Sequence, residues 1–385
     1  MKILFVHNSV AEYRLEFWRL LSKKVELQLL VTDKNLEKKE YGFRKDLSGL
    51  NIAYLSEDNY KEWLNNVVNY DIVVLPPVDL TQAYKISLDF IKAARRSTTK
   101  VVMWTEAWVW KKLPLHKIIK KGYISILRKQ ICNKSDFCIV SGSQSYKYMK
   151  GLGVDERKLA IVYDSSTSPK PTISDIRKLH GIPESSRIVL YLSRIMRLKG
   201  LDLLIDAFSN IADKYPDSYL LIAGDGGYKK YCEQLAETKA VKSRIKFVGK
   251  VEPIQRACYF KESDMLVLPS HADHGEIEIW GLVVNECLEQ GCPIVTTTAV
   301  GSGYDLIDDS CGKFVTENSV DELAKGIEHV LSLPKGKVVA NCKERYEEFS
   351  VQKMADGFYD VFQKVVRLEN TRSDEAKMLN GNNIC

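Results

Sequence analysis

Residues 187–208 predict a β-strand followed closely by an α-helix, and they read RIVLYLSRIMRLKGLDLLIDAF. The run 187–192 is apolar, which is typical of a parallel strand covered on both faces. The segment that begins at Lys199 has the apolar spacing of an amphipathic helix. The loop between the two places Arg194 and Lys199 just past the carboxyl end of the strand. Repetition of this unit builds a parallel sheet flanked by helices.

The same alternation extends over most of the chain. The other apolar runs of strand length lie at 2–7, 26–31, 71–75, 100–104, 136–140, 159–163, 218–224, 244–249, 264–269, 293–297 and 312–316. Together with 187–192 they form two successive sets of six. We therefore expect an α/β protein of two doubly wound, Rossmann-like domains. Because such sheets bind ligands beyond the carboxyl ends of their strands, we expect the two domains to face a cleft that holds the site.

The expected domain boundaries follow from composition. The segment 164–175, DSSTSPKPTISD, has the Ser, Thr and Pro content of a linker. We therefore place one domain at 1–165 and the second at 166–350. An amphipathic helix at 351–368 is expected to pack back on the first domain. The remaining residues, 369–385, are polar without periodicity and predict a disordered tail.

Charge is concentrated in one part of the first domain. The whole chain carries +6, but residues 111–150 contain ten Lys or Arg and a single acid, Asp136, so that segment alone carries +9. Such a patch indicates an anionic surface as partner. Within it, 108–131 mixes basic residues with Trp, Leu, Ile and Tyr, the pattern of an interfacial helix. The alternative is an ordinary helix whose apolar stripe packs on the sheet.

Other features narrow the class of protein. No apolar run is long enough to span a membrane, and the apolar part of the first strand is too short for a secretory leader. The nine cysteines are irregularly spaced, so we expect reduced thiols in a cytoplasmic protein. Neither half has a GxGxxG motif after its first strand, which argues against a dehydrogenase. We expect no nucleic-acid partner.

A second polar loop follows the strand 264–269 and reads SHADHGEIEIWGLVVNE (270–286). Its glutamates Glu278 and Glu286 lie eight residues apart, so both can reach one pocket and accept hydrogen bonds from vicinal hydroxyls. Gly281 is expected to open a helix whose first amides could face a phosphate, as Arg194 and Lys199 could. Alternatively, Arg194 and Lys199 are two solvated surface residues that bind no ligand. The run HADHGE contains metal-binding residue types, but a loop beside a site is polar in any case, and we expect no metal.

These residues resemble glycosyltransferase family 4, the retaining enzymes of GT-B fold, and in particular members that build bacterial surface polysaccharide. The resemblance rests on SRIMRLKG (193–200), IAGDG (222–226), the E-x7-E pair with WGLVVNE (280–286), GCPIV (291–295) and the glycine-rich turn near 301–303. It is specific over 187–333 and colinear but weaker over 1–163. By this resemblance 166–350 is the nucleotide-sugar domain and 1–165 the acceptor-side domain.

The resemblance implies a role for each motif residue. Arg194 and Lys199 would bind the donor diphosphate, Glu278 the transferred sugar and Glu286 the ribose. Backbone amides at Gly281, Leu282 and Val283 would meet the phosphates, and the backbone near Val248 and Val251 would recognise the base.

The chain departs from the family pattern in its first domain. The first loop is HNSVAEYRLEF (7–17) rather than a glycine pair, and WTEAW (104–108) stands where many members carry a histidine. The acceptor-side candidates are therefore Asn8, Tyr13, Arg14 and Glu106.

The expected function is transfer of a hexose-type sugar, with retention, from a nucleotide-sugar, UDP-linked, to a lipid-linked saccharide acceptor. No cofactor or metal is expected. The enzyme would be cytoplasmic and peripheral on the inner face of the cell membrane. The alternatives are a sugar-nucleotide epimerase of the same fold, or a non-catalytic glycan- or membrane-binding protein.

Overall fold

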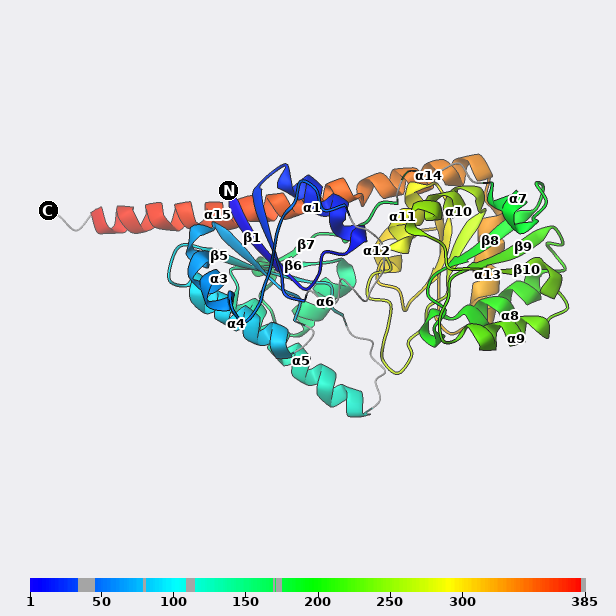
Figure 1. Cartoon of the computed structure of the whole chain (residues 1–385), viewed down its shortest axis with the longest axis horizontal. Coiled ribbons are helices and arrows are strands. Elements are labelled where there is room, and N and C mark those ends of the chain that lie inside the picture. Colours follow the sequence, from blue (N-terminus) through cyan, green and yellow to red (C-terminus); the bar gives the residue numbers. More distant parts are fainter. Residues whose placement is uncertain (34–45, 79–80, 109–114, 169, 171–174, 382–385) are drawn as a thin grey trace. The chain divides into compact units, whose positions relative to one another are not determined.

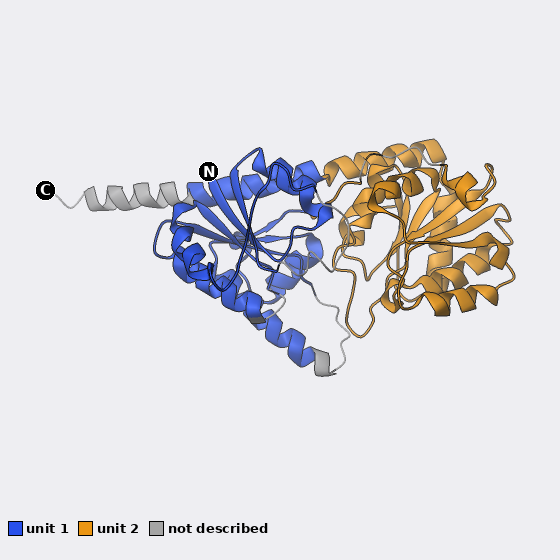
Figure 2. Cartoon of the chain, viewed as in Figure 1, with its two compact units in different colours: residues 1–108, 115–163, 351–385 blue, residues 109–114, 164–350 orange. Residues whose placement is uncertain are grey.

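The computed structural model describes residues 1–33, 46–78, 81–108, 115–168, 170 and 175–381, without the side chains of 81, 115–117 and 368–381. The chain forms two compact units (Figure 2). Unit 1 comprises Met1–Trp108, Leu115–Tyr163 and Val351–Cys385, and the body of unit 2 is Asp164–Ser350. The chain therefore passes from unit 1 to unit 2 at Tyr163/Asp164, two residues before the expected boundary.

Unit 1 is built on a seven-stranded parallel sheet in the order β3-β2-β1-β4-β5-β6-β7 (Figure 1). Its strands are β1 (Lys2–His7), β2 (Glu26–Val31), β3 (Asn51–Tyr54), β4 (Ile72–Leu75), β5 (Lys100–Thr105), β6 (Phe137–Val140) and β7 (Leu159–Ile161). Strand β3 is missed by the sequence analysis. It is a four-residue edge strand that is nowhere fully buried, so it lacks the apolar run by which the other six are recognised.

Helices cover both faces of this sheet. They are α1 (Leu15–Ser22), α3 (Tyr60–Asn66), α4 (Thr81–Ala94), α5 (Leu115–Lys134), α6 (Ser143–Gly151) and α15 (Val351–Gly381). Successive residues of β1 point to opposite faces: Ile3 and Phe5 pack with α1 and α15, whereas Leu4 and Val6 pack with α4 and α5. The expected return of the last helix onto the first domain is thus observed.

Helix α15 is longer than the sequence analysis predicts. It continues to Gly381, through most of the segment expected to be a disordered tail. That segment, NTRSDEAKMLNG, contains strong helix formers and no proline, so it can extend a helix whose start is fixed by packing. Residues 382–385 of the expected tail lie outside the described residues.

Unit 2 contains a six-stranded parallel sheet in the order β10-β9-β8-β11-β12-β13. Its strands are β8 (Arg187–Leu192), β9 (Ser218–Ala223), β10 (Ile245–Gly249), β11 (Met265–Leu268), β12 (Ile294–Thr297) and β13 (Gly312–Val315). Its helices are α7 (Ile176–His180), α8 (Leu201–Ile211), α9 (Lys229–Glu237), α10 (Arg256–Glu262), α11 (Val283–Glu289), α12 (Gly303–Leu306), α13 (Val320–Ser332) and α14 (Lys335–Glu348). All six strands match the predicted runs.

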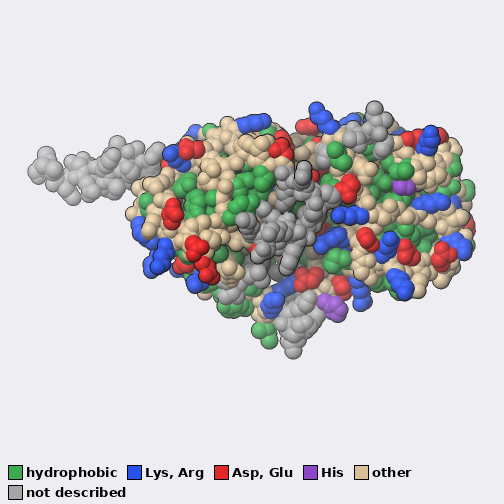
Figure 3. Space-filling model, in the orientation of Figure 1, with side chains coloured by type: hydrophobic (Ala, Val, Ile, Leu, Met, Phe, Trp, Pro, Cys, Tyr) green, Lys and Arg blue, Asp and Glu red, His purple; other side chains and the backbone are tan. Residues whose placement is uncertain are grey.

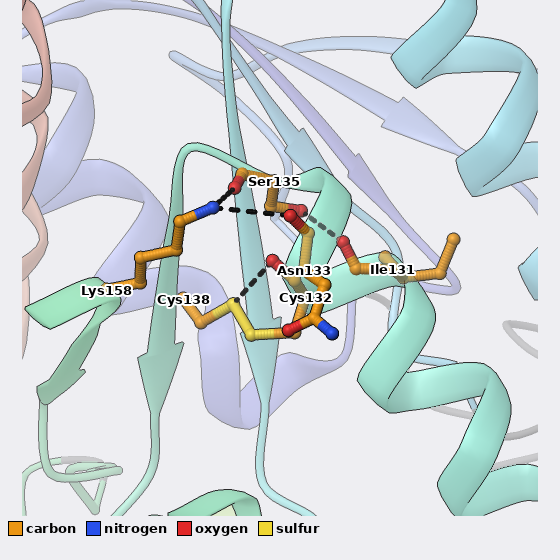
Figure 4. Close-up of a disulfide and its surroundings, with 6 residues drawn as sticks. All are labelled: Ile131, Cys132, Asn133, Ser135, Cys138 and Lys158. Atoms are coloured by element: carbon orange, nitrogen blue, oxygen red, sulfur yellow. Dashed lines mark hydrogen bonds between the residues drawn. A yellow bond between two sulfur atoms is a disulfide. The ribbon is translucent and has the colours of Figure 1, made fainter. Parts of the chain in front are cut away.

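One pair of cysteines differs from the expectation of free thiols. Cys132, near the end of α5, and Cys138, in β6, form a disulfide (Figure 4). The turn between helix and strand brings their Cα atoms to 6.1 Å, within the range that a disulfide spans. Lys158 closes the same turn by donating to the carbonyls of Asn133 and Ser135 at 3.2 and 2.9 Å. Cys232, Cys258, Cys287, Cys292, Cys311 and Cys342 are buried thiols, and Cys385 lies outside the described residues.

Candidate functional site

The topology of unit 2 fixes where a ligand is expected. The strand order reverses between β8 and β11, and doubly wound sheets bind ligands beyond the carboxyl ends of the strands at this switch point. The loop after β8 carries Arg194 and Lys199, and the loop after β11 carries Glu278. These are the two loops that the sequence analysis singled out, and the fold makes them neighbours.

Lys199 and Glu278 form an ion pair in which Nζ of Lys199 donates to Oε2 of Glu278. Both side chains are largely buried, with 10% and 20% exposed. Lys199 ends a short 3-10 turn, Arg197–Lys199, and helix α8 begins two residues later, at Leu201. Burial and the nearby charge of Arg194 lower the pKa of Lys199 to about 7, while the pairing with Glu278 acts in the opposite direction. Arg194 itself is exposed.

Two glycines allow the loops to approach each other. Gly200 has φ +64°, and a Cβ there would collide with the carbonyl of Pro269 at the end of β11. Gly281 has φ +90°, and a Cβ there would lie 3.0 Å from Val300 and 3.2 Å from the Glu278 side chain. Neither position accepts another residue without strain. Gly281 precedes α11 rather than opening it, since the helix starts at Val283 and Leu282 is its N-cap.

Glu286 lies inside α11 and is almost completely buried, with 2% of its side chain exposed. The Nη1 atom of Arg256 donates to both of its carboxylate oxygens, at 3.2 and 2.9 Å. The sequence analysis missed Arg256. A signal was present: Arg256 is the first residue of α10, where the helix dipole disfavours a cation unless a carboxylate pairs with it.

Trp280 holds the segment between the two glutamates in place. Its indole Nε1 donates to Oδ1 of Asn285 at 3.0 Å, and its carbonyl accepts from the hydroxyl of Ser302 at 2.7 Å. Both Trp280 and Asn285 are buried. Trp280, Val284 and Asn285 thus belong to the core of unit 2, with Glu278 partly exposed at one end of the stretch and Glu286 buried at the other.

The remaining donor-side candidates are partly exposed. Val248 lies in β10 and Val251 in the loop that follows, while Leu282 and Val283 stand at the start of α11. In the HADHGE loop, His271 is hydrogen-bonded to the carbonyl of Arg197 at 2.9 Å. Among the residues that the structure describes, no group of three or more His, Cys, Asp or Glu is placed to share a metal ion.

The acceptor-side candidates lie in unit 1, past the ends of β1 and β5. Arg14 is 3% exposed in its side chain and pairs with Glu106 at 2.7 Å, and its guanidinium lies 5.0 Å from the Trp104 ring. Glu106 is 35% exposed. His7 stacks on Trp104, and burial, with a contribution from the Arg14 charge, lowers the pKa of His7 to about 4. Asn8 and Tyr13 are partly exposed.

The sequence of unit 2 matches a known family over residues 172–349, described as glycosyl transferases group 1. The matched residues make up less than half of the chain and fall in the sequence of unit 2. The matched segment contains Arg194, Lys199, Glu278 and Glu286, and it includes residues 187–208, from which the fold was predicted.

Relatives and solved structures agree with this family. An uncharacterised glycosyltransferase of Methanocaldococcus jannaschii is 27% identical over 49% of this chain and 47% of its own length. A D-inositol 3-phosphate glycosyltransferase of Corynebacterium urealyticum is 24% identical over 60% and 59%. The chain thus spans about half the length of the curated relatives that it matches. Anabaena HepE, solved in complex with UDP, has a TM-score of 0.74 at 16% identity, covering 94% of this chain and all of that one. The fold is therefore that of the GT-B glycosyltransferases.

Proposed function

We propose that this protein is a retaining glycosyltransferase that moves a hexose-type sugar from a UDP-linked donor to a hydroxyl of a lipid-linked saccharide. The observation that carries the proposal is the ion pair of Lys199 with Glu278 at the switch point of the sheet of unit 2. It brings together a lysine, which can bind phosphate, and a glutamate, which can bind hydroxyls. The two meet beyond the carboxyl ends of the strands, where sheets of this type bind ligands.

On the donor side, Arg194 and Lys199 neutralise the diphosphate, because two cations stabilise the charge that develops on a departing phosphate. Glu278 accepts hydrogen bonds from the sugar and Glu286 from the ribose. The amides of Gly281 to Val283 add donors to the phosphates, and the backbone at Val248 and Val251 recognises the base. We propose that no divalent metal takes part, so activity should survive EDTA.

The reaction balances without a protein nucleophile. The bond between the anomeric carbon and the diphosphate oxygen breaks, and the acceptor oxygen forms a bond to the same carbon from the same face. The proton of the acceptor hydroxyl passes to an oxygen of the departing diphosphate. The configuration at the anomeric carbon is thereby retained.

In unit 1 we assign the acceptor contact to Glu106 rather than to Arg14. Arg14 is enclosed by Trp104, Tyr13 and Glu106, and it acts through Glu106 by fixing the orientation of that carboxylate. The hydroxyl of Ser145 holds the Glu106 carbonyl at 2.6 Å. A fixed, partly exposed carboxylate is suited to accept a hydrogen bond from a sugar hydroxyl. Asn8 and Tyr13 remain candidates for further contacts.

Helix α5 supports the membrane part of the proposal because it has two apolar faces. Ile124, Leu127 and Ile131 pack in the core of unit 1. On the other side four large apolar side chains stand in solvent: Ile118 (48% exposed), Ile119 (72%), Tyr123 (51%) and Ile126 (56%). These four residues are not part of the stripe that packs in the core. The alternative of an ordinary helix packed on the sheet therefore does not account for their exposure.

Basic residues accompany the exposed face, since Lys120 is exposed and Lys121 and Lys129 are partly exposed. On the visible face of unit 2, acidic and basic side chains are interspersed (Figure 3). Of the other residues in 108–131, Trp108 is buried, and Trp110, Lys111, Lys112 and Leu113 lie outside the described residues. No described helix has the length and hydropathy of a membrane span. We propose peripheral attachment to the inner face of the cell membrane.

The decisive experiment is a panel of nucleotide-sugars tested for thermal stabilisation of the protein. A ligand present at 100 times its dissociation constant adds about 2.7 kcal/mol to the free energy of unfolding. The donor found in this way is then incubated with lipid-linked saccharides, and the anomeric configuration of the product is determined by NMR. A panel without any stabilising nucleotide-sugar, or a product with inverted configuration, contradicts the proposal.

A further inference from the structure

Asn285 is a buried amide whose two polar atoms serve different parts of unit 2. It lies in α11, and its side chain is fully buried. Its Oδ1 accepts from the indole Nε1 of Trp280 at 3.0 Å. Because an indole N–H can only donate, this contact fixes which atom of the amide is the oxygen. The Nδ2 atom is thereby assigned to a second group of neighbours.

That second group consists of three oxygens from the segments through which the chain joins the two units. The chain enters the body of unit 2 at 164–168, the entry segment, and leaves it at 349–350, the exit segment. In the entry segment, Nδ2 lies 3.2 Å from Oγ of Ser165 and 3.5 Å from the carbonyl oxygen of Asp164. In the exit segment it lies 3.4 Å from the carbonyl oxygen of Phe349. One side chain therefore contacts both segments.

The Asn285 amide cannot bond strongly to all three oxygens at once. Nδ2 carries two hydrogens, and its distances to the three oxygens are at the long end of the hydrogen-bonding range. A small rotation of the amide would strengthen the bond to one segment and weaken the bond to the other. Such an exchange costs little, because one acceptor replaces another. The amide can therefore respond to a small displacement of the atom bonded to its Oδ1.

Trp280, which donates to that Oδ1, belongs to the loop that carries the proposed donor site. It stands between Glu278 and Gly281, and its carbonyl accepts from the backbone N–H and the hydroxyl of Ser302 at 3.0 and 2.7 Å. The backbone of Glu278 is bonded to the same turn, since the N–H of Gly301 donates to its carbonyl at 3.0 Å. Residues 278–283 form what we call the donor loop. The indole is thus fixed to this loop, and Asn285 connects it to the two segments.

The entry segment depends on side-chain contacts with α11 for its order, because it contains no helix or strand. The hydroxyl of Ser166 donates to the carbonyl of Leu282 at 3.3 Å. The N–H and the hydroxyl of Ser168 donate to Oε2 of Glu289 at 2.7 and 2.8 Å. A change in the bonds from Asn285 should therefore alter how often the amides of this segment open to solvent.

We propose that Asn285 is a positioning residue that couples the donor loop to the entry and exit segments, so that a nucleotide bound at the loop reduces the motion of the segments through which the chain joins unit 1. The bound nucleotide orders the loop, the loop fixes the indole, and the indole selects one orientation of the amide. This inference rests on the proposed function, since it requires a nucleotide at the donor loop.

The test is amide hydrogen exchange of the full-length protein, measured by mass spectrometry with and without UDP. In wild type, UDP should slow exchange both in 278–286 and in 164–168. The second effect should be about fivefold or more, the lower end of the range for coupled sites. Trp280→Phe removes the indole N–H and keeps an aromatic ring. In this variant UDP should still slow exchange in 278–286 and should leave 164–168 unchanged.

Asn285→Asp interrupts the same path at its other end. It keeps an oxygen for the indole N–H, but it places a second oxygen opposite the three oxygens that Nδ2 contacts. The variant should show the same separation of the two effects, together with a lower melting temperature, because buried acceptors then lose their donor. Trp18→Phe is the matched control. Trp18 is also fully buried, and its Nε1 has no hydrogen-bond partner among the described residues. Both effects of UDP should remain there as in wild type.

The outcomes separate the inference from the proposed function. If UDP slows exchange in 164–168 of folded Trp280→Phe as much as in wild type, the inference is wrong and the proposed function stands. The same conclusion follows if UDP protects only 278–286 in wild type. If wild type binds neither UDP nor GDP, ADP or CDP, the proposed function fails, and the inference fails with it.

Discussion

Lys199 and Glu278 are 79 residues apart in the chain and form an ion pair at the point where the sheet of unit 2 reverses its strand order. Each lies in a loop whose conformation requires a glycine. For Lys199 this is Gly200, after β8, and for Glu278 it is Gly281, after β11. The ion pair shows that the two loops present opposite charges to the same small volume. A donor molecule bound there would meet a cation for its diphosphate and a carboxylate for its hydroxyls.

Removal of either cation should impair catalysis more than folding. Arg194→Ala or Lys199→Ala is expected to lower turnover by about a hundredfold or more, because each removes a donor to the charge of the leaving diphosphate. Steady-state kinetics, with melting temperature as the check on folding, measures the effect. Lys230→Ala, an exposed lysine of α9, is the matched control. Near-wild-type turnover in the folded double variant would falsify the assignment.

The low pKa of Lys199 predicts a pH dependence of donor binding. Lys199 is a cation below about pH 7 and loses its charge as the pH rises through that value. Affinity for the intact nucleotide-sugar, whose phosphodiester charges do not change in this range, should therefore fall roughly tenfold between pH 6 and pH 9. Lys199→Arg should flatten the profile, because arginine stays charged. A flat wild-type profile, or an equally steep one for the variant, would rule the explanation out.

Substitution of the two glutamates should affect different kinetic quantities, turnover for one and nucleotide affinity for the other. Glu278→Gln is expected to reduce turnover chiefly, since the proposed target of Glu278 is the reacting sugar. Glu286→Gln should chiefly weaken binding of free UDP, since the proposed target of Glu286 is the ribose. Turnover and UDP affinity, measured for both variants, decide between the roles. Unchanged UDP affinity in Glu286→Gln would show that the ribose assignment is wrong.

Helix α5 should bind anionic membranes. Wild type is expected to float with liposomes that contain anionic lipid and to be released by high salt, because each lysine near such a surface contributes about 1 kcal/mol. Lys120→Glu with Lys121→Glu should abolish flotation, and Ile119→Ser with Ile126→Ser should weaken it. Lys230→Glu with Lys261→Glu, exposed in unit 2, makes the same charge change away from α5. Equal recovery on neutral and anionic vesicles would disprove membrane docking.

The sequence by itself determined the alternation of strands and helices, the two-domain division and the loops that carry Arg194, Lys199, Glu278 and Glu286. These features depend on local properties: apolar runs of strand length, helical periodicity and glycines at tight turns. For the same reason the short, half-exposed strand β3 was missed, and the helical continuation of α15 beyond 368 was mistaken for a tail.

Only the tertiary structure decided which charges meet. The partners of Glu286 and Glu106 are Arg256 and Arg14, which come from other elements, and a local pattern does not say which carboxylate a given cation meets. The same holds for the Cys132–Cys138 disulfide, because six residues of separation say nothing about whether a turn folds the chain back. Burial divides the apolar residues of α5 into a packed face and an exposed one, since the sheet covers only one side of a helix. The sequence shows which residues are apolar and how they are spaced, whereas packing alone determines what lies against each of them.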